Sequence, residues 1–148
     1  MNFLEEAIKE AKKAYKKAEI PVGCVIVKDG VIISKGHNLR ETKNNSLAHA
    51  EIIAINKACK KLKNWRLDEC EMYVTLHPCL MCSGAIISSR IKKVYFGAYE
   101  NNMNKTFVDQ FKNYNIFEYI ENKECSTLLI DFFKDLRCGK IKKINKKL

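Results

Sequence analysis

The amino-acid sequence predicts a single α/β domain over residues 1–148. Short β-branched runs of strand length alternate along the chain with longer segments whose apolar residues recur at helical spacing. No internal repeat or linker divides the 148 residues, which is about the length of one domain. Hydrophobic residues make up 47% of the chain and charged residues 30%, which is typical of globular proteins. No apolar run approaches the roughly 20 residues of a membrane span, so we expect no membrane association.

The first quarter of the chain predicts a helix followed by a β-hairpin. Residues 3–18 place apolar side chains at helical spacing, with lysines and glutamates on the opposite side. Pro21 cannot continue this helix, and the β-branched residues 22–27 predict a strand. The Asp29-Gly30 dipeptide favours a tight turn, after which residues 31–34 predict the returning strand.

The middle of the chain predicts a loop, a helix, a strand and a second helix. The polar segment 39–47 lacks periodicity, and a mostly apolar helical pattern begins at Ala48. Residues 71–76 predict a strand that ends where Pro78 interrupts it. A further apolar helix follows over residues 79–87.

The last third continues the alternation and ends in a basic segment. We expect a strand at 94–97, an irregular loop at 98–104, a short helix at 107–111, a strand at 115–120 and a final helix at 125–136. The basic C-terminal tail, residues 140–148, carries five lysines and predicts a helical extension or a frayed end.

Two short motifs, His49-x-Glu51 and Pro78-Cys79-x-x-Cys82, predict a catalytic zinc site. One imidazole and two thiolates provide three protein ligands, which leaves a fourth position open for water. A closed structural zinc site would need another ligand pair, which the chain lacks. A redox dithiol would leave His49 and Glu51 without a role.

The same motifs indicate hydrolytic deamination. Zinc lowers the pKa of water from about 15.7 toward 7. Glu51 is then placed to carry a proton from water to a ring nitrogen and on to the departing ammonia. The pattern H-x-E…P-C-x-x-C is the signature of zinc-dependent nucleobase deaminases, in which the glutamate is not a ligand.

The remaining cysteines do not suggest a disulfide framework. The total of seven is odd, and the N-terminus has no secretory signal, so we expect free thiols and a cytoplasmic protein. Small buried hydrophobic positions are expected for the five cysteines outside the motif, Cys24, Cys59, Cys70, Cys125 and Cys138.

The charge balance favours an anionic partner. The formal net charge is +10, from 27 basic and 17 acidic residues. Such an excess favours nucleic acid, although it would also serve solubility alone.

The sequence resembles the cytidine/deoxycytidylate deaminase superfamily, and within it the bacterial tRNA adenosine deaminases. The resemblance implies a three-layer α/β/α fold with a central five-stranded mixed sheet flanked by helices, and a zinc cofactor. It also implies a homodimer that converts adenosine to inosine at the wobble position (A34) of the tRNA anticodon loop. Besides the zinc motif, the resemblance is based on residues 21–23 (PVG), 36–38 (GHN), 64–67 (NWRL), 73–76 (YVTL), 82–86 (CSGAI), 89–91 (SRI), 96–98 (FGA) and 128–133 (LLIDFF).

The resemblance also implies substrate contacts. Asn38 would touch the flipped base, while Val22, Ala48 and Leu76 would shape its pocket. Judged from the sequence pattern alone, Asn38 is equally well a turn residue at the end of a strand. The Phe132-Phe133 pair is expected in the core rather than in a base-stacking platform.

Two departures from the family pattern bear on the substrate. His77 stands where the family usually has glutamate, and the loop after Ala98 is shorter than usual. We expect His77 beside the metal ligands or at the surface rather than as a fourth ligand. Because of these departures, the alternative that the protein deaminates a free base or nucleoside, such as cytosine or guanine, stays open. A non-catalytic nucleic-acid-binding relative is disfavoured because Glu51 and all three ligands are present.

Overall fold

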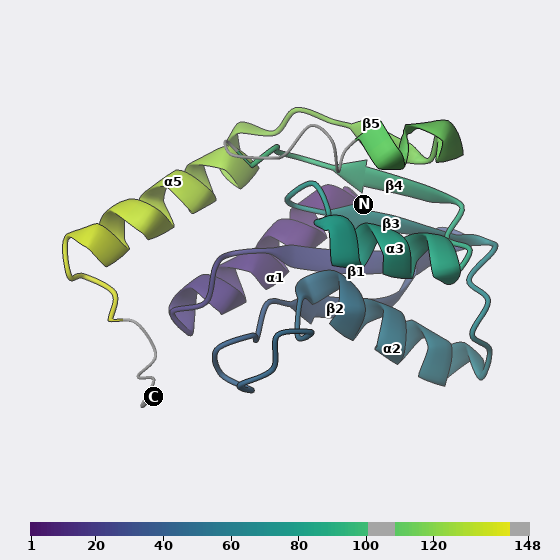
Figure 1. The fold of residues 1–148 in the computed structure, drawn as a ribbon, viewed down its shortest axis with the longest axis horizontal. Helices are drawn as coiled ribbons and strands as arrows, with labels where there is room; N and C mark the ends of the chain where they lie inside the picture. Colours follow the sequence, from purple (N-terminus) through teal and green to yellow (C-terminus); the bar gives the residue numbers. More distant parts are fainter. Residues whose placement is uncertain (101–108, 143–148) are drawn as a thin grey trace.

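A five-stranded mixed sheet lies at the centre of the computed structural model, which describes residues 1–100 and 109–142 (Figure 1). Its order is β2-β1-β3-β4-β5; β1 pairs antiparallel with β2 and β3, whereas β3, β4 and β5 are parallel. The strands are β1 (Gly23–Lys28), β2 (Val31–His37), β3 (Cys70–Val74), β4 (Lys93–Phe96) and β5 (Phe117–Tyr119).

Helices cover both faces of this sheet, which confirms the three-layer α/β/α arrangement. Helices α2 and α3 pack on one face and helices α1 and α5 on the other (Figure 1). Their bounds are α1 (Phe3–Lys16), α2 (Ala50–Leu62), α3 (Leu80–Ser88) and α5 (Lys123–Arg137), with a short 3-10 turn, η1 (Lys112–Tyr114).

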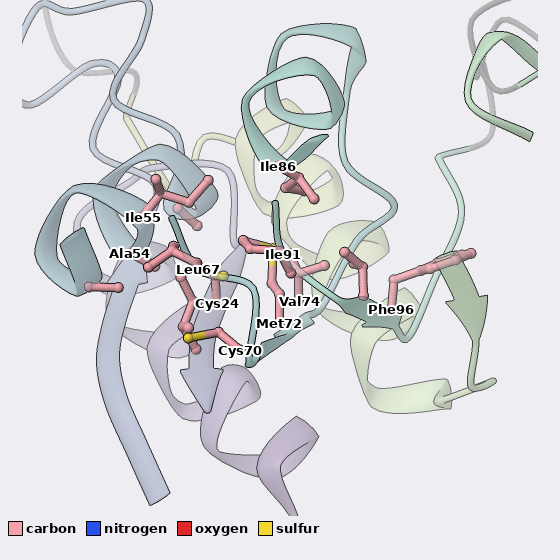
Figure 2. Packing of buried hydrophobic residues seen from close by; sticks show 14 residues of the cluster. Cys24, Ala54, Ile55, Leu67, Cys70, Met72, Val74, Ile86, Ile91 and Phe96 are labelled. Atoms are coloured by element: carbon pink, nitrogen blue, oxygen red, sulfur yellow. The ribbon is translucent and has the colours of Figure 1, made fainter. Parts of the chain in front are cut away.

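Strand β1 is buried on both sides, which is why its sequence is an unbroken apolar run. Cys24 and Ile26 belong to the core under α2 and α3, whereas Val25 and Val27 pack against α1 and α5. Figure 2 shows the first core, in which residues of β1, β3 and β4 meet those of α2 and α3.

A close approach between β2 and α2 depends on Gly36. A Cβ at this position would lie 2.5 Å from the carbonyl oxygen of Ala50, the first residue of α2. Because only glycine lacks that atom, Gly36 lets the N-terminus of α2 lie directly against the sheet.

The parallel strands end at a common edge of the sheet. Strands β3, β4 and β5 end at Val74, Phe96 and Tyr119. In open α/β sheets the carboxyl ends of the strands are where ligands bind. The segment after β3 carries His77 and Cys79, so the zinc motif lies at this edge.

Several expected boundaries were wrong by a few residues. Helix α1 ends at Lys16 rather than residue 18, because Ala18 adopts a left-handed backbone with φ 59°. Strand β2 continues to His37 rather than residue 34, since Gly23 of β1 pairs with His37. Strand β5 is shorter than the expected 115–120.

Parts of three expectations lie outside the described residues: the loop at 98–104, the short helix at 107–111 and the tail at 140–148. Within the described part, no helix combines the length and apolarity that crossing a bilayer requires.

The expectation of buried positions was wrong for part of the C-terminal helix. Cys138 is exposed because it caps α5 beyond the packed turns, and Phe133 is 39% exposed while Phe132 is buried. Cys24, Cys70 and Cys125 are buried as expected, and Cys59 is half-buried.

Candidate active site

Two helix N-termini meet at the carboxyl edge of the sheet. His49 is the N-cap of α2 and Cys79 is the N-cap of α3, with Cys82 in the first turn of α3. Neither N-cap side chain binds its own helix, so both are free to face each other. The partial positive charge of each helix N-terminus favours ionised thiolates here.

The three side chains form a cluster whose dimensions fit zinc. The Nδ1 atom of His49 lies 3.7 Å from Sγ of Cys79 and 3.6 Å from Sγ of Cys82. Tetrahedral zinc places its nitrogen and sulfur ligand atoms about 3.6 Å apart. One ligand atom from each residue lies within 4.8 Å of the others, and no other group of three in the described residues meets this criterion.

The two thiols differ in ionisation. The hydrogen bond from Cys82 lowers the pKa of Cys79 to about 4, and His49 contributes in the same direction. The pKa of Cys82 is raised, because its proton is held by Cys79 and because the side chain is buried. Binding a divalent cation releases this retained proton, so zinc affinity is coupled to pH.

Glu51 lies in the first turn of α2 and is only 3% exposed. Burial raises the pKa of Glu51 to about 7, and the negative charge of Cys79 acts in the same direction. A carboxyl group with a pKa near neutrality can both accept and release a proton at a small free-energy cost, as a proton shuttle requires.

A cavity of about 160 Å³ opens beside the cluster. The expected contact residues Val22, Asn38 and Leu76 line it together with His49, Glu51 and Cys79. Ala48 is buried but does not line this cavity. The structure therefore brings three of the four expected pocket residues to the cavity beside the candidate metal cluster.

The side chain of Asn38 is occupied by the protein itself. Its Nδ2 donates to the carbonyl oxygen of Ile20 at 3.3 Å, and its Oδ1 accepts from the backbone N–H of Arg40 at 3.1 Å. Asn38 thus acts as the turn residue that its sequence position also suggested, while it forms part of the cavity wall.

His77 is neither a surface residue nor a member of the metal cluster. It is 9% exposed, lines the cavity, and stacks on Tyr99 and Phe117 with ring centroids 5.7 and 5.6 Å away. The edge of Phe96 also meets its ring at 4.7 Å. Burial lowers the pKa of His77, so the ring is neutral at pH 7.

Sequence patterns missed part of the cavity wall. Ile20, Arg40, Ala50 and Glu100 also line it. Only Arg40 had a usable signal, a cation two positions after Asn38 in a loop; the others come from elements that meet only in the folded chain.

A second, larger cavity adjoins the first. Its volume is about 530 Å³, and it shares Ile20, Leu76 and Glu100 with the catalytic cavity. Its other wall is the half-exposed apolar face of α5, including Phe133, with Arg137 at the end of that helix. The catalytic cavity therefore opens into a groove along α5.

Residues 1–98 match the family model of the cytidine and deoxycytidylate deaminase zinc-binding region. The tRNA-specific adenosine deaminase of Bacillus subtilis (strain 168) is 45% identical over 143 residues, which cover 91% of this chain and 89% of that protein.

Two solved structures share the fold at appreciable identity. One comes from work on A-to-I editing by tRNA:A34 deaminases at the wobble position of transfer RNA; it has a TM-score of 0.77 and 34% identity, covering 86% of this chain and 98% of that chain. The other, a guanine deaminase from Bacillus subtilis, has a TM-score of 0.65 and 33% identity, covering 99% of each chain.

Proposed function

The chain belongs to the cytidine and deoxycytidylate deaminase family, and from this membership we propose that it is a tRNA adenosine deaminase that converts adenosine 34 to inosine. The tRNA-specific adenosine deaminase of Bacillus subtilis aligns along about nine-tenths of both chains. The solved tRNA:A34 deaminase is covered almost completely. This chain therefore matches both proteins over most of their length.

The proposed roles of the site residues follow from their positions. His49, Cys79 and Cys82 hold the metal through Nδ1 and two sulfurs. Bound zinc would supply Lewis acidity, which lowers the pKa of water at a site with an open position. Glu51 would accept one proton from the water and give it to a ring nitrogen, and then accept the second proton, from the added hydroxyl group, and give it to the leaving amine.

The continuity of the two cavities is the observation that best supports a polynucleotide substrate. The catalytic cavity is small, but it shares three wall residues with the groove of about 530 Å³ along α5. A free base would occupy the first cavity alone. A flipped nucleotide leaves its flanking residues outside the active-site pocket, and the groove offers them apolar and aromatic surface beside a cation, Arg137.

Deamination of a free base is the second candidate, supported by the similarity to guanine deaminase. His77, which lines the cavity, departs from the pattern of the tRNA branch, and so does the length of the loop after Ala98. The zinc cluster and Glu51 would serve either substrate, since both present an amidine carbon.

One experiment separates the candidates. The zinc-loaded protein is incubated with an anticodon stem-loop carrying A34, and inosine is read by sequencing; parallel reactions with guanine, cytosine and adenosine are followed by ammonia release. We expect inosine only in the RNA reaction. Turnover of a free base with no inosine in RNA would replace our proposal with the second candidate.

We further propose that the protein forms a homodimer, works in the cytoplasm and binds tRNA through its positive charge of +10. Sedimentation at equilibrium tests the dimer. Binding driven by phosphate neutralisation must weaken with salt, because each neutralised phosphate releases a counterion. Affinity for the stem-loop that stays constant between 50 and about 200 mM salt would contradict this mode of binding.

A further inference from the structure

Glu19 is a buried carboxylate that neither the zinc cluster nor the proton shuttle uses. It is 1% exposed and lies in the short connector between α1 and β1. Its Oε1 accepts the backbone N–H of Glu41 at 3.1 Å, and its Oε2 accepts that of Thr42 at 2.7 Å. Among the described residues no lysine, arginine or histidine forms an ion pair with it.

The two amides that Glu19 binds belong to the loop at 39–47. Nearly all side chains of this loop are exposed, so it has no apolar anchor between its ends. The bond from the N–H of Leu39 to the carbonyl oxygen of Ala48 closes its base at 2.9 Å. Glu19 therefore attaches the middle of the loop to the connector between α1 and β1.

The connector and the loop both form walls of the catalytic cavity. Ile20 and Val22 line it from the connector, and Asn38 and Arg40 line it from the loop side. Two more hydrogen bonds join these walls: Asn38 donates its Nδ2–H to Ile20 and its backbone N–H to the carbonyl oxygen of Val22, the latter at 3.1 Å.

We propose that Glu19 is a positioning residue that holds the 39–47 loop against the connector, and so fixes Arg40 at the mouth of the catalytic cavity for substrate binding. This inference rests on the proposed function for the identity of the substrate, an RNA loop. A buried carboxylate without a neighbouring cation carries a large desolvation cost. Its two bonds to consecutive amides offset that cost only while the loop stays in this position.

We expect the contact between Glu19 and the loop to affect RNA binding rather than the rate of the deamination step. Arg40 is an exposed cation that lines the cavity. Its Nη2 lies 3.6 Å from Oε1 of Glu41. A partly exposed ion pair of this kind contributes little stability, so the guanidinium can turn to a phosphate of the substrate.

Glu51 and the three metal-cluster residues lie at the N-termini of α2 and α3. The loop leads into His49, but its C-terminal end is held without Glu19, by the bonds from the N–H of Leu39 to the carbonyl oxygen of Ala48 and from the N–H of His49 to that of Leu47. Loosening the loop should therefore weaken RNA binding and leave the deamination step and zinc content intact.

The test compares Glu19→Gln with Glu69→Gln in the full-length protein. Glu69 is exposed, at the far end of β3, and makes no side-chain bond in the described residues, so it controls for the lost charge. In Glu19→Gln one acceptor oxygen becomes an NH₂ group that cannot accept an amide. Hydrogen exchange at the amides of Glu41 and Thr42 should then become about tenfold faster, because a bond to a charged acceptor is lost.

Single-turnover kinetics with the A34 stem-loop provide the second readout. We expect the RNA concentration at half-maximal rate to rise about tenfold in Glu19→Gln, with the maximal rate and zinc content unchanged. Glu19→Asp keeps the charge on a shorter side chain and should give an intermediate value, which keeps the test open should Glu19→Gln fail to fold.

Unchanged exchange at the loop amides would overturn the proposal, as would a fall in the maximal rate without a change in half-saturation. Failure of the wild-type protein to edit A34 would overturn the proposed function instead. The exchange measurement needs no substrate, so it still decides whether Glu19 holds the loop.

Discussion

His77 donates its Nδ1–H to the carbonyl oxygen of Pro78 across 2.9 Å. Because a carbonyl oxygen can only accept, the proton of the neutral ring is on Nδ1. The hydroxyl of Ser83 donates to the same oxygen at 3.2 Å. These two donors stabilise the turn that positions Cys79. The ring of His77 is itself held in place by stacking on Tyr99 and Phe117.

Replacing His77 with phenylalanine should loosen this turn. His77→Phe keeps a flat ring for the stack but removes the donor, so we expect zinc to be released to a colorimetric chelator about three- to tenfold faster. Ser83→Ala removes the other donor and should act in the same direction. Ser89→Ala is the control, since it removes a similar bond, 2.8 Å to the carbonyl oxygen of Ala85, at the distant end of α3. Equal release rates in all four proteins would show that the turn does not depend on these bonds.

Glu51→Gln should abolish deamination without loss of zinc. The amide has the size of the carboxyl group but cannot accept the proton, and positioned acid–base groups contribute about 10²–10⁴-fold to rate. The measurement is the single-turnover rate on the A34 stem-loop, with zinc quantified by mass spectrometry in the same preparation. Activity within tenfold of the wild type would remove Glu51 from the mechanism.

Removing a thiolate should remove both zinc and activity. We expect Cys82→Ser to purify with less than about a tenth of the wild-type zinc, because a serine hydroxyl is not ionised at neutral pH and binds zinc poorly. Cys138→Ser is the matched control, since Cys138 is exposed and lies outside the metal cluster. A zinc-replete, active Cys82→Ser protein would contradict the ligand assignment.

His37 should make the protein less stable in mild acid. Burial lowers the pKa of His37 below its usual 6.5, and Lys17 and Lys13 act in the same direction, although Glu10 opposes them. The unfolded chain therefore binds a proton that the folded chain resists, so the unfolding free energy falls as pH drops through about 6.5. Glu10 adds to the loss at lower pH: although burial opposes it, hydrogen bonds with Lys13 and His37 lower its pKa, and its contribution disappears as it is protonated.

The check is the slope of unfolding free energy against pH, from urea titrations between pH 7 and 5. In His37→Gln the side chain no longer titrates but can still donate to Glu10, so the slope should become smaller than in the wild type. An identical slope in both proteins would assign the acid sensitivity to other groups.

The alternating sequence pattern predicted well those elements of the fold that depend on interactions between residues close in sequence. The hairpin at Asp29-Gly30, the apolar run of β1 and the amphipathic α1 all depend on neighbours along the chain. Errors occurred where partners are distant. Strand β2 runs on to His37 because β1 supplies hydrogen bonds there, and Phe133 is half-exposed because α5 meets the sheet along a narrow face.

Within the site, the sequence alone predicted the residues for one reaction class. The spacings in the two motifs put His49 and Cys79 at the N-caps of two helices, with Glu51 and Cys82 in the first turns. Only the tertiary structure decided what surrounds them. His77 is buried because three parallel strands end side by side, and Glu19 reaches the 39–47 loop across about twenty residues of chain. Short spacings constrain side chains through local geometry, whereas cavity walls are formed by segments that only folding brings together.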